Sequence, residues 1–140
     1  RWMAMESGTI PQKNSVLVVD DDLEALAEMS EALRDTGLTV FEANNGEDAV
    51  LTAKSRLPAF VVMDYRLPGM NGLQSIDVMK QFLPDTVFIV VTGVDAFRNQ
   101  ATIDSTQVYS ILQKPLNIDV IARFIHTKLD HGDFRVESAI

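Results

Sequence analysis

The chain has 140 residues, of which 46% are hydrophobic and 23% are charged, a composition typical of one globular domain with a buried core. Its 12 basic and 20 acidic residues leave a formal net charge of -8, which disfavours direct binding to nucleic acid or to an anionic membrane. There is no cysteine, which excludes disulfides, thiolate metal sites and a cysteine nucleophile. No apolar run approaches the roughly 20 residues needed to cross a bilayer, and we expect a cytoplasmic domain.

The polar, aperiodic ends of the chain set the expected domain limits. Residues 1–13 lack an apolar segment of signal-peptide length and are predicted to be a tail or vector-derived residues. Residues 14–130 are predicted to form one domain. Residues 131–140 are predicted to be a C-terminal tail or the start of a linker.

Five short apolar runs predict five β-strands. The first, third and fourth runs are continuous rather than alternating, which is typical of strands buried on both faces of a parallel sheet. The five runs span residues 16–19, 38–43, 59–63, 87–91 and 108–112.

Segments with the period of an α-helix separate these runs. Gly37 and Pro84 are expected to end two of the helices, and Asn117 is placed to cap the last one. In the first helix, either Met29 or Ser30 completes the apolar face. The predicted helices cover residues 23–33, 47–55, 73–83, 96–103 and 118–129. Strand and helix thus alternate five times, which predicts an α/β sandwich around a parallel sheet.

Polar residues follow four of the predicted strands. The first strand ends in residues 20–22, all aspartate, the third in Asp64, the fourth in Thr92 and the fifth in Lys114. In open parallel sheets, ligands bind outside the carboxyl ends of the strands, so we expect these side chains to converge. Asp22 has a simpler explanation, because it directly precedes a helix and is predicted to be its N-cap.

Convergence of Asp20, Asp21 and Asp64 would cost electrostatic free energy unless a cation neutralised the carboxylates. Mg²⁺ prefers oxygen ligands and commonly takes one or two carboxylates together with phosphate oxygens. Asp21 and Asp64 could bind it directly and Asp20 through a water molecule. Lys114 and Thr92 would then suit the oxygens of a phosphoryl group. A carboxylate can act as the nucleophile, and chemistry alone leaves all three aspartates as candidates.

Four segments, in their order and spacing, resemble the receiver domains of two-component response regulators, of the chemotaxis-regulator-like kind. They are Val-Leu-Val-Val-Asp-Asp-Asp at 16–22, Val-Val-Met-Asp-Tyr-Arg-Leu-Pro-Gly-Met-Asn-Gly at 61–72, Val-Val-Thr-Gly at 90–93 and Gln-Lys-Pro at 113–115. The resemblance covers residues 14–129, and the segment from Asp64 to Gly72 is its most specific part.

The resemblance implies that Asp64 is the phosphoacceptor. It also implies that Asp20, Asp21, Asp64 and the backbone carbonyl of Arg66 hold Mg²⁺ or Mn²⁺. Thr92 and Lys114 correspond to the switch hydroxyl and to the lysine that pairs with the phosphoryl group.

The fold implied by the resemblance is a doubly wound (βα)5 flavodoxin-like sandwich with strand order 2-1-3-4-5 and five helices. The peptide bond between Lys114 and Pro115 is expected to be cis. The implied phosphodonor is a histidine kinase or a histidine phosphotransfer protein, and a homodimer could form through helix 4, strand 5 and helix 5. Val120 and Phe124 widen the apolar stripe of the last helix and favour a partner surface there.

One departure from the family pattern concerns an aromatic residue of the phosphorylation switch. Receiver domains usually carry Phe or Tyr three residues before the lysine, whereas this chain has Ile111 there and Tyr109 two residues earlier. Tyr109 would share a strand face with Ile111 and could substitute for the missing ring.

Two other functions remain open. A receiver-like module could bind partners without phosphorylation, but such modules usually lack the acidic pair, the acceptor aspartate or the lysine. A haloacid-dehalogenase-like phosphatase would need a second aspartate two residues after Asp64, and Arg66 occupies that position. We therefore expect a signalling phosphoacceptor, limited to self-phosphotransfer and autodephosphorylation, rather than an enzyme.

Overall fold

The computed structural model describes residues 12–93, 110–114 and 117–131. Within these residues, nine helices and strands follow one another along the chain. Their order is β1 (Gln12–Val19), α2 (Leu23–Asp35), β2 (Thr39–Ala43), α3 (Gly46–Arg56), β3 (Pro58–Asp64), α4 (Gly72–Lys80), β4 (Val87–Thr92), β5 (Ser110–Gln113) and α7 (Ile118–His131).

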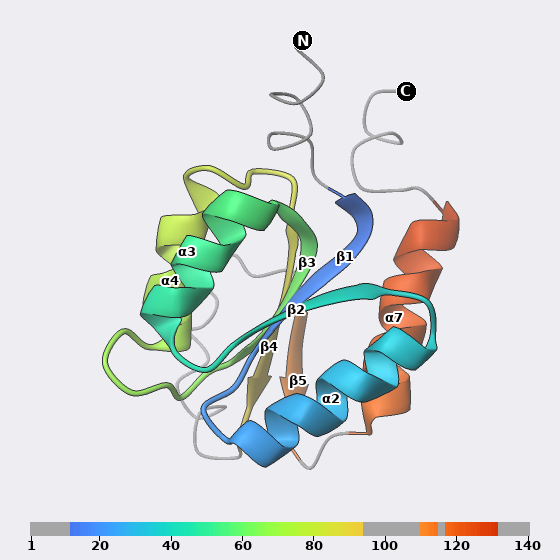
Figure 1. Cartoon of the computed structure of the whole chain (residues 1–140), viewed down its shortest axis with the longest axis horizontal. Coiled ribbons are helices and arrows are strands. Elements are labelled where there is room, and N and C mark those ends of the chain that lie inside the picture. Colours follow the sequence, from blue (N-terminus) through green and yellow to red (C-terminus); the bar gives the residue numbers. More distant parts are fainter. Residues whose placement is uncertain (1–11, 94–109, 115–116, 132–140) are drawn as a thin grey trace, which may run out of the picture.

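The five strands form one parallel sheet in the order β2-β1-β3-β4-β5. Helices α3 and α4 cover one face of this sheet, and α2 and α7 cover the other (Figure 1). The predicted doubly wound α/β fold and its strand order are therefore confirmed. The helix predicted at 96–103 lies outside the described residues.

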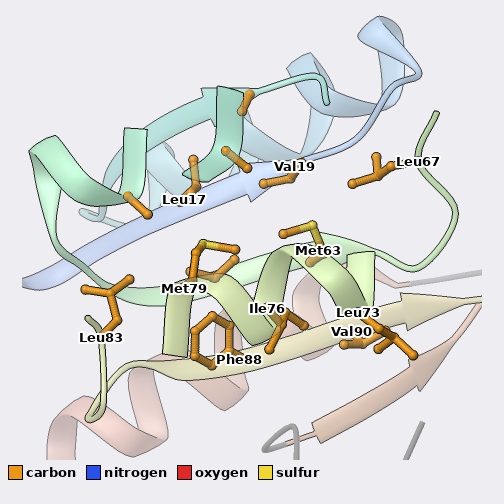
Figure 2. Packing of buried hydrophobic residues seen from close by; sticks show 14 residues of the cluster. Leu17, Val19, Met63, Leu67, Leu73, Ile76, Met79, Leu83, Phe88 and Val90 are labelled. Carbon is orange, nitrogen blue, oxygen red and sulfur yellow. The ribbon is translucent and has the colours of Figure 1, made fainter. Parts of the chain in front are cut away.

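The central strands are buried on both faces, as their continuous apolar runs predict. All six residues of β4 are buried, and so are six of the seven residues of β3. Successive side chains of a strand point to opposite faces. Leu17 of β1 accordingly joins the apolar cluster under α3 and α4 (Figure 2), whereas Val16 joins the cluster under α2 and α7.

Several element boundaries differ from those predicted. The first strand begins at Gln12, where its backbone pairs with Pro58 of β3, although its early residues are polar. The third helix ends at Lys80 instead of continuing to Leu83. Leu83 is still buried, because a turn in which its amide donates to the Met79 carbonyl returns it to the core. The last helix extends to His131.

The side chains predicted to cap two helices do so through hydrogen bonds to backbone amides. Asp22 is the N-cap of α2, and its carboxylate accepts hydrogen bonds from the amides of Glu24 and Ala25. Asn117 accepts a hydrogen bond from the amide of Asp119 at the start of α7. These side-chain oxygens satisfy amides that have no partner within the helix. Gly37 follows α2 with φ of 99°, a conformation that favours glycine.

Ser30, rather than Met29, is the fully buried residue of the pair on α2. Its hydroxyl is the buried side-chain polar group within the described residues that has no hydrogen-bond partner. An unsatisfied buried hydroxyl costs about 1–3 kcal/mol. We therefore expect Ser30→Ala to raise the free energy of unfolding by about 1 kcal/mol, with an unchanged denaturant m-value.

Ser55→Ala provides the matched control for this stability prediction. Ser55 is exposed near the end of α3, and its hydroxyl donates to the Thr52 carbonyl. Its replacement changes helix propensity by a few tenths of a kcal/mol but relieves no buried polar group. The prediction about Ser30 would be wrong if urea denaturation showed the same gain for both variants.

Candidate functional site

Three aspartates converge at the carboxyl ends of β1 and β3. Asp64 is the last residue of β3, and Asp20 and Asp21 directly follow β1, which is its neighbour in the sheet. One carboxylate oxygen of each lies within 4.8 Å of the others. The predicted acidic cluster is thus present, and its residues come from two segments more than 40 positions apart in the sequence.

The three carboxylates differ in exposure. Asp64 is only 7% exposed, Asp20 is half-buried and Asp21 is exposed. The Asp20 side chain is oriented by the amide of Asp22, which donates to its Oδ1 at 2.9 Å. Burial raises the pKa of Asp20, the amide of Asp22 opposes this shift, and the charge of Asp64 adds to it. The ionised form of Asp20 is therefore less favourable in this cluster than in water.

Lys114 supplies the positive charge of the site. Its Nζ lies 3.1 Å from Oδ2 of Asp64, and its amide donates to the carbonyl of Thr92 at 2.8 Å. Burial alone would lower the pKa of Lys114. The hydrogen bond and the negative charge of Asp64, with help from Asp20 and Asp21, outweigh burial, so this pKa lies above its ordinary value.

The other oxygen of Asp64 is also engaged. Its Oδ1 accepts a hydrogen bond from the amide of Arg66 at 3.1 Å. The side chain of Arg66 is exposed. Asp64 is thus held by an amide on one oxygen and by an ammonium group on the other.

Thr92 lies at the end of β4, where it is 1% exposed. Its neighbour Val91 is the register partner of Asp64, and the Val91 carbonyl accepts a hydrogen bond from the amide of Tyr65. Thr92 therefore stands one residue beyond Asp64 on the adjacent strand. Its hydroxyl donates to the Gly93 carbonyl at 3.4 Å, a long and weak bond that a better acceptor could replace.

A pocket of about 240 Å³ opens beside this cluster, on the face of the sheet that α2 and α7 cover. Asp20, Asp64 and Lys114 line it together with apolar side chains of the strands. Helix α2 contributes Glu28 and Met29, which sequence reasoning did not assign to the site. Both occupy ordinary positions in a helix that packs on a sheet, so nothing in the sequence marked them as residues of the site.

The donor set suits a hard divalent cation. Three carboxylates face one lysine, so the cluster retains excess negative charge, and oxygen is the ligand atom that Mg²⁺ prefers. Arg66 lies two residues after Asp64 and its amide contacts the Asp64 carboxylate, so its backbone lies beside the cluster. These residues fit the predicted metal site.

Some predicted features fall outside the described residues, namely Tyr109 and the bond to Pro115. Ile111 is half-buried and packs against the cluster under α3 and α4. On α7, Val120 is 46% exposed. Phe124 packs against the cluster under α2 and α7, with the ammonium of Lys128 5.6 Å from its ring centre. Part of the wide apolar stripe of α7 is thus used within the domain.

Residues 16–126 match the family model of the response regulator receiver domain. Because the match covers most of the chain, the chain belongs to this family, whose members are signalling modules of two-component systems.

Curated relatives and solved structures agree with this assignment. The chain is 28% identical over 114 residues to the photosynthetic apparatus regulatory protein RegA of Cereibacter sphaeroides, covering 81% of this chain and 62% of that protein. It is 28% identical over 120 residues to the transcriptional regulator NtrC of Salmonella typhimurium, covering 86% of this chain and 26% of that protein. The chain therefore spans less than two thirds of the length of these relatives. A CheY-like receiver domain from Methanospirillum hungatei has the same fold, with a TM-score of 0.78, 24% identity, and coverage of 84% of this chain and 94% of that one.

None of the described helices combines the length and the hydropathy that crossing a bilayer would require.

Proposed function

We propose that Asp64 accepts a phosphoryl group from a histidine kinase or a histidine phosphotransfer protein, with the help of Mg²⁺. The observation that carries this proposal is the environment of Asp64. It is a nearly buried carboxylate that lies beside two further carboxylates and 3.1 Å from the ammonium of Lys114. Phosphoryl transfer needs positioning and charge neutralisation more than covalent help from the protein, and this site offers both.

In the proposed step, an oxygen of Asp64 attacks the phosphorus atom of a phosphohistidine. The new bond is an acyl phosphate, the bond between phosphorus and the donor's imidazole nitrogen breaks, and that nitrogen keeps the electron pair. Bound Mg²⁺ would neutralise charge on the carboxylates and on the transferred group. Asp20, Asp21, Asp64 and the Arg66 carbonyl are the proposed ligands.

The surroundings favour Asp64 as the nucleophile over the other two aspartates. Asp21 is exposed and Asp20 is half-buried, whereas Asp64 is only 7% exposed and makes the direct contact with Lys114. Lys114 contacts Asp64 and would follow its oxygen into a contact with the phosphoryl group. Thr92, on the adjacent strand, is proposed to donate its hydroxyl to another phosphoryl oxygen.

The alternatives are less well supported. A phosphatase would need an acid–base residue where Arg66 stands. A module that binds partners without phosphorylation would have no use for a cluster of three carboxylates, which costs free energy to assemble. We therefore propose a phosphoacceptor that does not turn over external substrates. Phosphorylation is proposed to change the surface that binds partners, including any homodimer formed through the fourth helix that the resemblance implies, β5 and α7.

Beryllofluoride, a phosphoryl mimic, tests the site and its output together. With Mg²⁺, it is expected to shift the amide resonances of Asp64, Thr92 and Lys114, because their side chains would contact the mimic and Thr92 would give up its bond to Gly93. Asp64→Asn should abolish these shifts. Unchanged spectra of the parent would favour the binding module, whereas multiple turnover of a small phosphate ester would favour the phosphatase.

A further inference from the structure

The first turn of α3 lies unusually close to the segment that follows Asp64. We call residues 65–71, which connect β3 to α4, the acceptor loop. A Cβ atom at Gly46 would lie 2.5 Å from the carbonyl oxygen of Met70 in this loop and would also overlap the hydroxyl of Ser75 in α4. Real Cβ atoms essentially never approach a neighbour within 3.0 Å, so a larger residue at position 46 would force the Met70 backbone, the Ser75 side chain or the start of α3 to shift.

The lack of room for a side chain, rather than the backbone conformation, explains why position 46 is a glycine. Among the described residues, the glycines with positive φ are Gly37 and Gly69. Gly46 is buried at the start of a helix, where alanine would have the higher helix propensity. Close approach of two backbones is the other common reason for a glycine, and Gly46 makes such an approach.

Two further observations place α3 beside the acceptor loop. The carboxylate of Glu47 lies beside Gly69, 3.4 Å from the position that a Cβ atom would take. Leu67 is only 8% exposed and belongs to the same apolar cluster as Ala49 of α3 (Figure 2 labels Leu67). The loop is therefore packed against α3 at residues 69 and 70, and Leu67 shares a buried apolar cluster with this helix.

The acceptor loop in turn holds Asp64. The amide of Arg66 donates to Oδ1 of Asp64, and the amide of Gly72 donates to the carbonyl of Tyr65, which closes the loop. Gly72 itself has no free space, because a Cβ atom there would lie 2.5 Å from the Asp64 carbonyl oxygen. The loop is thus closely packed at its α4 end and bonded to Asp64 through Arg66, and we expect a displacement at Met70 to be felt at Arg66.

We infer that Gly46 is a positioning residue for the phosphoacceptor: the absence of a side chain lets α3 press the acceptor loop into the conformation that orients Asp64 and presents the Arg66 carbonyl. The expected effect on Mg²⁺ affinity rests on the proposed function, in which the Arg66 carbonyl is a Mg²⁺ ligand. Groups that orient metal ligands typically change metal affinity 10–100-fold when they are altered.

The test uses the full chain with Gly46→Ala and, as matched control, Gly37→Ala. A side chain at Gly37 meets nothing within 4 Å, but its φ of 99° makes any other residue strained, so the control loses stability far from the loop. Gly46→Ala is expected to shift the Arg66 amide resonance in metal-free protein and to lower Mg²⁺ affinity about 10-fold. Gly37→Ala should do neither. Titrations are made at a temperature where all variants are folded.

A second variant guards against misfolding of the first. Gly46→Ala/Ser75→Ala removes the nearest obstruction and leaves that of the Met70 carbonyl, so it should show the same changes at reduced size when it is compared with Ser75→Ala. Ser75→Ala is the reference because it loses the hydrogen bond from this hydroxyl to the Asn71 carbonyl of the loop. The inference is overturned if the folded Gly46 variants keep the parent's Mg²⁺ affinity and Arg66 resonance, or if Gly37→Ala changes both equally. A parent that binds no Mg²⁺ would instead contradict the proposed function, and the Arg66 resonance would still decide the role of Gly46.

Discussion

Asp64→Asn is expected to abolish phosphoryl uptake from acetyl phosphate, lowering the rate at least about a thousand-fold while the protein remains folded. The amide oxygen of asparagine is a poor nucleophile. It can nevertheless accept the hydrogen bond that the Arg66 amide now gives to Oδ1 of Asp64. Loss of the ion pair with Lys114 is offset by weaker repulsion from Asp20 and Asp21. Incorporation of radiolabelled phosphate, followed with time, measures the rate.

Asp77→Asn is the control for this replacement. Asp77 is exposed on α4, away from the acidic cluster, so its charge has no part in the proposed chemistry. It should incorporate phosphate like the parent. Undiminished incorporation by folded Asp64→Asn would mean that another carboxylate is the nucleophile, with Asp20 and Asp21 the first candidates.

The second large effect concerns metal binding: one double variant should raise the stability of the metal-free protein and remove the stabilisation by Mg²⁺. Asp20→Asn/Asp21→Asn should stabilise the metal-free protein by up to about 1 kcal/mol, the repulsion of two unit charges about 4 Å apart in water. This sign is expected because, for Asp20, the repulsion from Asp64 exceeds the attraction to Lys114 that is lost with it. The same variant should lose the stabilisation by Mg²⁺, which for the parent is about 2.7 kcal/mol at a hundred times the dissociation constant. Thermal unfolding with and without Mg²⁺ measures both effects.

The raised pKa of Asp20 adds a pH dependence to this prediction. A carboxyl group whose pKa is higher in the folded state stabilises the fold fully below its unfolded pKa, and this contribution is lost as pH rises through the folded pKa. The stabilising effect of the double variant should therefore be present at neutral pH and shrink as the solution is acidified toward the ordinary aspartate range, about pH 4.

Asp22→Asn is the matched control for the double variant. Asp22 is adjacent in sequence, but its carboxylate caps α2, and asparagine is an equally good N-cap. The control removes one negative charge next to the cluster without removing a proposed ligand. If it abolished the Mg²⁺ response as completely as the double variant did, general charge rather than specific coordination would explain the response.

The fold could be predicted because its signals are local. The continuous apolar runs at Val16–Val19 and Val87–Val91 can be satisfied only where both faces of a strand are covered. Side chains such as Asp22 cap a helix through hydrogen bonds with the next few residues. Boundaries were less accurate where backbone pairing or tertiary contact decides them, as at Gln12 in β1 and at Leu83 beyond α4.

The acidic cluster and Lys114 could also be predicted, because strand ends in a parallel sheet meet at one edge. What could not be predicted depends on close contacts between distant segments. Gly46 is unremarkable in the sequence until the Met70 carbonyl is seen beside it. Ser30 occupies an ordinary helical position, and only its burial without a hydrogen-bond partner predicts that it destabilises the fold.

Phosphorylation of the parent chain, mapped to a residue by mass spectrometry, tests the role of Asp64 most directly. After incubation with acetyl phosphate and Mg²⁺, we expect a mass increase of one phosphoryl group per chain, located on the peptide that contains Asp64 and abolished by a chelator of divalent cations. Absence of the increase at saturating Mg²⁺, or its location on a peptide without Asp64, would contradict the proposal that Asp64 is the phosphoacceptor.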